Sequence, residues 1–217
     1  MNKYYTVGGY TDIEKLPSDG SDNYATNTGH ILEFKDARGV GSAISFKAFI
    51  NGFSQSFTSN WNTEQVFGRM DDLATFKNTT RSISVSWEVP SESLKQAQVN
   101  LQRCNKLVHL LYPTYDPAHA NTMKKAPFVT IKYSNLLQSA NGTGGLFGYI
   151  TGLTWTPVLE LGYYHSKDGI FPKVISISVE FTAIHYGGKG ETGYLESSEG
   201  LGIRKDSKFP FGGPSKI

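Results

Sequence analysis

Hydrophobic residues alternate with polar ones along several stretches of the chain, which is the period of a β-strand with one buried face. The clearest stretch is Thr79 to Val89, in which Ile83, Val85 and Trp87 alternate with serines. The stretch from Val174 to His185 shows the same alternation. Both stretches predict strands that pack on a core with one face, while the other face is wet or covered by a neighbour.

A further strand signal, from Ser42 to Phe57, changes phase part-way along. Its apolar residues fall on even positions up to Ile50 and on odd positions from Phe53 onward. Because successive side chains point to opposite faces, such a change requires one extra residue in the strand. We place a β-bulge or a sharp bend between two sheets at Gly52.

Downstream, the pattern predicts a hairpin and a short strand. The stretches Phe128 to Leu137 and Leu146 to Trp155 alternate and flank Asn141-Gly142, a strong turn signal. Residues 114–127 read as a loop, and Val158 to Tyr164 as another short strand.

Helical periodicity occurs between about residues 91 and 112. Apolar residues recur there at three- and four-residue steps: Leu94, Ala97, Leu101, Cys104, Leu107, Val108 and Leu111. Ser93 and Gln96 have the spacing of a capping box, and Pro113 ends the helix. The apolar stripe predicts a helix that docks on a sheet.

The order of strands, one helix and strands predicts an α+β, mainly β fold. We expect an antiparallel β-sandwich or small barrel with the helix at about 91–112 packed on it. The 13 Phe, 12 Tyr and 23 Gly residues agree with a fold rich in strands and turns. Residues 29–186 form the predicted β domain, preceded by a polar N-terminal arm, 1–28, and followed by a Gly-rich C-terminal tail, 187–217.

Composition narrows the classes of function. The 21 basic and 19 acidic residues are interspersed, so no basic stripe indicates nucleic-acid binding. The single cysteine, Cys104, cannot form an intrachain disulfide and is expected to pack within the helix stripe. Neither a secretory signal nor an 18-residue apolar run is found, so we expect a soluble chain made in the cytoplasm, with no membrane partner.

Candidate catalytic chemistry is sparse. The five histidines lack metal-ligand spacing, and the phosphate-loop and nucleophile-elbow motifs are absent from the sequence. The run Arg69-Met70-Asp71-Asp72 contains two carboxylates, but adjacent residues on an extended chain point to opposite faces. A turn or an ion pair is the favoured interpretation. We therefore expect no enzyme, no cofactor and no metal.

Long amphipathic strands and two extended termini on a modest core indicate an assembly component. Strand edges that lack a partner are commonly paired with another subunit, and arms without a core become ordered on a neighbour. The alternative is a monomeric β-sandwich that binds carbohydrate or peptide through an aromatic patch.

Several motifs carry a more specific resemblance. They are Phe57-Thr58-Ser59-Asn60-Trp61, Glu64 to Asp71, Phe76 to Arg81, Trp87-Glu88-Val89, Leu110 to Pro113 and Gly148 to Pro157. Together with the closing strand through Phe181, they resemble baseplate and tail-tube-initiator proteins of contractile-tailed phages, over about two thirds of the chain.

The resemblance implies a tail-tube-like fold, six copies of which form a ring whose inner sheets line a channel. Its partners would be itself, the tail tube protein and baseplate hub or wedge proteins, with genomic DNA only passing through the lumen of the virion. The ring would template the first layer of the tube.

The resemblance also implies that residues 61–79 form a loop that reaches toward a neighbour. Candidate intersubunit contacts are Trp61, Glu64, Arg69, Asp71 and Arg81. For Arg69 and Asp71, an ion pair within the same chain remains an equal alternative.

Overall fold

A computed structural model describes most of the predicted β domain. The described residues are 24–25, 27, 29–39, 42–47, 49–115, 122–139, 144–167 and 169–185. The predicted tail and nearly all of the predicted N-terminal arm lie outside them.

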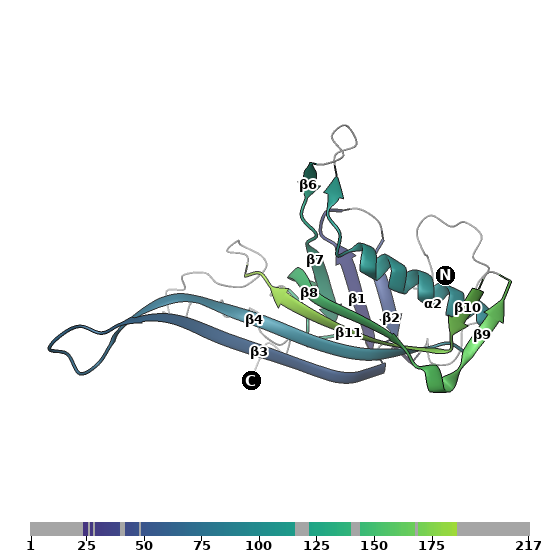
Figure 1. The fold of residues 1–217 in the computed structure, drawn as a ribbon, viewed down its shortest axis with the longest axis horizontal. Coiled ribbons are helices and arrows are strands. Elements are labelled where there is room, and N and C mark those ends of the chain that lie inside the picture. The colour runs from purple at the N-terminus through teal and green to yellow at the C-terminus, as the bar shows by residue number, and fades with distance from the viewer. Residues whose placement is uncertain are drawn as a thin grey trace.

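Most described residues belong to strands. The bounds are β1 Ile31–Asp36, β2 Ile44–Lys47, β3 Phe49–Glu64, β4 Leu73–Pro90, β5 Thr114–Tyr115, β6 Met123–Lys125, β7 Val129–Tyr133, β8 Leu146–Pro157, β9 Tyr163–Ser166, β10 Gly169–Pro172 and β11 Val174–Ala183. Seven of them form one antiparallel sheet in the order β2-β1-β7-β8-β11-β4-β3, while β5-β6 and β9-β10 are separate two-stranded ribbons (Figure 1). The predicted mainly β fold with one flanking helix is confirmed.

The large sheet curls until its two halves face each other across a core. Phe34 on β1 lies 5.7 Å from Trp87 on β4, measured between ring centroids, although three strands separate β1 from β4 in the sheet. Phe46 on β2 contacts the same indole at 5.5 Å. Trp87 is completely buried, so the two halves pack as a sandwich around it.

The helix α2, Leu94–His109, closes the core beside the strands. Ser93 is its N-cap and accepts a hydrogen bond from the Gln96 N–H at 3.3 Å, while the Gln96 side chain accepts one from the Glu92 N–H at 2.8 Å. Cys104 and Leu107 on the apolar stripe join the core. The helix is slightly shorter at both ends than the predicted 91–112.

The predicted phase change in the first long strand is present. The β3–β4 register shifts between Ile50 and Gly52, so the extra residue is Asn51, next to the predicted position. A side chain at Gly52 would crowd Ser86, because its Cβ would lie 2.7 Å from the Ser86 Oγ.

The predicted hairpin between β7 and β8 is also present, with Val129 opposite Gly148 and Ile131 opposite Leu146. Its turn at Asn141-Gly142 lies outside the described residues.

Three local predictions are wrong. Val158 to Tyr164 is not a strand, because a 3-10 turn, η1 Leu159–Leu161, ends at Gly162 with φ of 78° and β9 begins only after it. Residues 114–127 are not wholly a loop, since they include the β5-β6 ribbon. Residues 61–79 are not simply a loop either, because β3 and β4 continue through most of them as a hydrogen-bonded ladder.

Candidate assembly interface

Strands β3 and β4 extend beyond the rest of the sheet as a two-stranded ribbon, the long projection in Figure 1. Strand β11 pairs with β4 only from Arg81 to Pro90, whereas the β3–β4 ladder continues to the pair Glu64–Leu73. We call residues 58–80 the arm and its end, residues 64–73, the tip. Within the described part of the chain, the arm has no third strand and no core.

The arm is held together by cross-strand side-chain pairs. Asn60 donates to the Asn78 Oδ1 at 2.9 Å, and the rings of Trp61 and Phe76 meet edge to face at 5.2 Å. Such pairs contribute a fraction of a kcal/mol to about 1 kcal/mol each. Because an isolated two-stranded hairpin is at best marginally stable in water, the arm is the part of the described fold that gains most from a partner.

The tip presents apolar side chains to solvent. The Arg69 N–H donates to the Val66 carbonyl oxygen at 3.1 Å, and Gly68, with φ of 86°, turns the chain. The side chains of Phe67 and Met70 are fully exposed. Large apolar groups gathered at the end of a projection are typical of an interaction site.

Four of the five predicted contact residues lie on the arm. Trp61 is about half exposed on β3, Glu64 is the last residue of β3, and Arg69 and Asp71 lie in the tip. Among the described residues, neither Arg69 nor Asp71 forms an ion pair. Both charges therefore face solvent in the single chain.

Arg81, the fifth predicted contact residue, lies at the root of the arm. Its side chain is completely buried at the root of the arm, where Nε and Nη2 donate to the Gln55 Oε1 at 3.0 and 2.6 Å. Its guanidinium also lies over the Phe57 ring, 5.2 Å from the centroid. In the single chain this guanidinium therefore contacts residues of its own chain.

Burial shifts the pKa of Cys104 and of His185 in the body. Burial raises the pKa of the Cys104 thiol to about 12, so the thiol stays protonated and packs as expected. Burial, together with the positive charge of Arg81, lowers the pKa of His185. Among the described residues, no cluster of His, Cys, Asp or Glu has the arrangement of a metal site.

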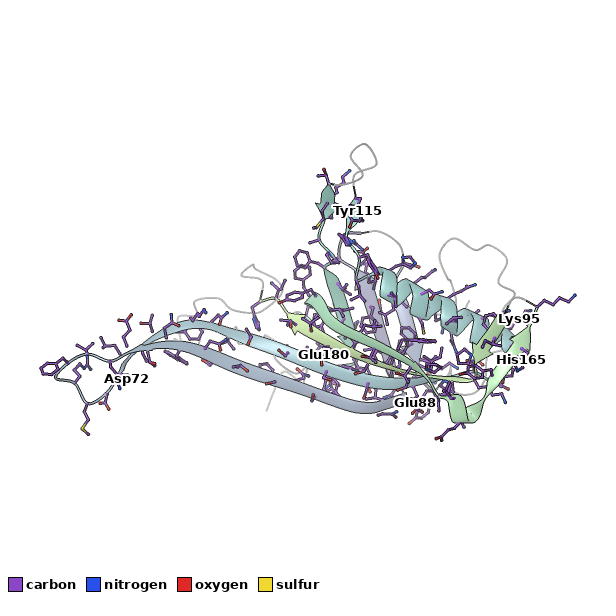
Figure 2. The ribbon with its side chains drawn as sticks, in the orientation of Figure 1. Asp72, Glu88, Lys95, Tyr115, His165 and Glu180 are labelled. Atoms are coloured by element: carbon purple, nitrogen blue, oxygen red, sulfur yellow. The ribbon has the colours of Figure 1, made fainter. Side chains whose placement is uncertain are left out.

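The convex face of the β11-β4-β3 half carries small polar side chains. Ser84 on β4 lies between Ser54 on β3 and Glu180 on β11, and Ser86 lies opposite Ser178. Figure 2 labels Glu88 and Glu180 along these strands. No helix among the described residues covers this face, so it is a second surface, mainly polar, with Phe49 about half exposed beside Glu88.

The β5-β6 ribbon is a third surface, which the sequence prediction missed. Tyr112, Tyr115 and Met123 are more than half exposed there, next to the exposed pair Lys124-Lys125. The sequence signal that could have indicated this surface is the combination of aromatic and basic residues in the segment predicted only as a loop. None of the described helices has the length and hydrophobicity needed to cross a membrane.

Comparisons with known proteins give only distant structural likenesses. No known family and no curated protein matches the sequence. The Dit (gp 19.1) protein of SPP1, described as a paradigm of the hub adsorption apparatus in phages infecting Gram-positive bacteria, shares a TM-score of 0.39 and 12% identity, over 70% of this chain and 49% of that one. This chain thus matches about half of the Dit protein.

Two virus-like particles provide further likenesses. A chain from the tail of an empty gene transfer agent particle has a TM-score of 0.35 and 12% identity, over 73% of this chain and 93% of that one. A chain from the baseplate of the anti-feeding prophage has a TM-score of 0.30 and 9% identity, over 70% of this chain and 87% of that one. At these values the likenesses assign neither a family nor a function.

Proposed function

We propose that the chain is a structural subunit of a phage-type tail, which assembles into a ring, six copies in number, at the junction of tail tube and baseplate. In this role it connects the hub to the tube and templates the first layer of tube protein, within the virion. The arm carries the proposal, because it projects from a folded body with no described core of its own and ends in fully exposed Phe67 and Met70.

The shape of the sheet supports a ring. Strand β3 is an edge of the large sheet over its whole length, and β2 is the opposite edge. Unpaired edges and an arm on one side give each subunit two different surfaces, which is the requirement for a head-to-tail contact that closes into a ring. The motifs resembling tail-tube initiators lie mainly on β3, β4, the tip between them and β8.

The polar convex face suits the lining of the channel. Its serines and threonines are small, and Glu88 and Glu180 are acidic. Passing DNA would be repelled by these carboxylates and would find no basic side chain among them to hold it. Genomic DNA would therefore pass through the lumen without binding.

The ring is tested by imaging the purified full chain with negative-stain electron microscopy, together with light scattering in the same buffer. The test variant is Phe67→Ser with Met70→Ser, and the matched control is Leu159→Ser with Leu161→Ser, which removes two other exposed apolar side chains from η1. We expect closed rings for the wild-type and control chains. The tip variant should need at least about tenfold more protein to assemble, because truncating an interface anchor costs more than ~1 kcal/mol.

Circular dichroism checks that all three chains fold alike, as expected when only exposed side chains change. Rings from the tip variant at the wild-type concentration would remove the arm from the interface. A wild-type chain that stays monomeric at high concentration would favour the alternative, a monomeric β-sandwich binding carbohydrate or peptide, which a glycan and peptide screen would then test.

A further inference from the structure

We propose that the tip of the arm docks on the β5-β6 ribbon of a second copy of the chain. The inference builds on the proposed self-assembly and names the two surfaces that meet. Each of the two surfaces has the chemistry that the other lacks.

The tip is apolar and acidic. Phe67 and Met70 are fully exposed, and Glu64, Asp71 and Asp72 are exposed carboxylates of the same segment. Arg69 is the basic residue of the tip, so three negative charges face one positive charge. Such a surface is suited to a partner that offers both apolar area and positive charge.

The ribbon offers that combination. Tyr112, Tyr115 and Met123 provide exposed apolar surface, and Lys124 and Lys125 are exposed beside them. The aromatic faces of the tyrosines can also receive the guanidinium of Arg69. The ribbon thus offers apolar surface to Phe67 and Met70 and positive charge to the carboxylates of the tip.

One described carboxylate, Asp36, interacts with the ribbon, because the positive charge of Lys125 contributes to lowering its pKa. The closest ion-pair partner of Asp36 is Arg38, because the Asp36 carboxylate accepts hydrogen bonds from the Arg38 Nε at 2.8 and 3.0 Å. Arg38 in turn donates to the Tyr112 carbonyl oxygen at 2.8 Å, which fixes the backbone at the base of the ribbon. The lysines therefore remain available to an acidic partner.

The two surfaces project from different parts of the molecule. Asp72 at the end of the arm and Tyr115 on the ribbon are labelled far apart in Figure 2. A tip therefore meets a ribbon from another copy, and because the two patches differ, the contact is head-to-tail and can repeat around a ring.

A single contact of this size is weak. The tip is one turn and its flanks, well below the roughly 1,000 Å² of a stable interface, and it gains strength only when it is repeated in a closed assembly. The test must therefore detect a transient encounter between full chains.

Cross-linking between chains that each carry one added cysteine provides such a test. The Met70→Cys chain and the Met123→Cys chain are mixed in equal amounts with a short bis-maleimide, whose span tolerates some freedom in register. The natural Cys104 is buried and its pKa is about 12, so it does not compete. Random collision gives mixed and symmetric cross-links in a ratio of about one. Docking should raise that ratio on the order of tenfold, because it holds the two thiols at a high local concentration.

Charge reversal provides the control. Adding Asp71→Lys and Asp72→Lys to the Met70→Cys chain should return the ratio to about one. Adding Lys124→Glu and Lys125→Glu to the Met123→Cys chain as well should restore the excess of mixed product. A simple loss of folding cannot produce this restoration.

The outcomes separate this inference from the proposed function. Wild-type rings combined with a ratio of one, or with a ratio insensitive to charge reversal, would overturn the docking and leave the ring in place. An excess of mixed product that follows the charges, without rings, would support the docking and count against the ring.

Discussion

At the scale of single residues, the root of the arm is unusual because it contains a buried arginine, Arg81. Arg81 is buried beside Gln55 and Phe57, and its charge acts on His185. Its position was readable from the sequence, because Arg81 shares the odd-numbered phase of Ile83 and Val85 on the inward face. The resemblance made Arg81 a candidate contact, whereas its phase places it on the inward face.

The other predicted contact residues were placed on the exposed arm by motif resemblance, not by periodicity. Nothing in the sequence pattern distinguishes an exposed arginine at a tip from one in any surface turn. The phase of alternation gives burial, whereas the partner of an exposed charge depends on groups outside the chain.

His185 leads to a prediction of pH dependence. Burial and the neighbouring Arg81 lower its pKa in the folded chain below the 6.5 of an unperturbed histidine. The unfolded state therefore binds more protons than the folded state. The contribution of His185 to the free energy of unfolding should be fully present above about pH 6.5 and should be lost as the pH falls toward the folded pKa.

Urea unfolding of the wild type between pH 7.5 and 5, with a His185→Gln variant alongside, measures this dependence. The variant should be less sensitive to pH in this window, whereas His109→Gln, which changes an exposed histidine at the end of α2, should keep the wild-type slope. Equal slopes for the wild-type and His185→Gln chains would contradict the assigned burial.

At the scale of elements, strands that pack on the core were predictable and the arm was not. In β11 and the inner part of β4, alternation reflects one face in the core. Along the arm neither face meets a described core, so Ser, Thr and Asn replace the alternating apolar residues while the backbone ladder continues. Hydrogen bonding between strands leaves no period in the sequence, so periodicity did not correct the loop that the resemblance implied for residues 61–79.

Strand β8 offers a matched pair of glycines for a test of packing. A Cβ at Gly148 would overlap the carbonyl oxygen of Thr182 and the ring of Phe181 on β11, both held by the sheet and the core. A Cβ at Gly152 would approach the Glu180 carboxylate at 3.3 Å, the end of a side chain that can move.

We expect Gly148→Ala to lower the free energy of unfolding by about 1–3 kcal/mol through overpacking, and Gly152→Ala to change it by less than about 1 kcal/mol. Urea denaturation monitored by circular dichroism measures both. Equal effects of the two substitutions would show that β8 and β11 are not packed as closely as described.

At the scale of the whole molecule, the class of fold followed from the order of elements, but the curl of the sheet did not. The contact between Phe34 and Trp87 joins residues far apart in the chain and across three intervening strands. Periodicity assigns both residues to inward faces without stating that they face each other. That pairing depends on sheet twist and strand order, which are properties of the assembled sheet.

The same division between body and arm predicts how stability is distributed. The body is closed around Trp87, so its amides should exchange with solvent only through global unfolding, whereas arm amides should exchange through cheaper local opening. Hydrogen exchange by mass spectrometry on the monomer should therefore show residues 58–80 exchanging far faster than β4 from Arg81 to Pro90. In assembled rings the arm should approach the protection of the body, because pairing with a neighbour supplies its missing contacts.

The Phe67→Ser, Met70→Ser chain at the same concentration is the control, and its arm should remain unprotected. An arm already as protected in the monomer as the body would mean that its order is independent of assembly, and the main physical reason for assigning it a partner would be lost.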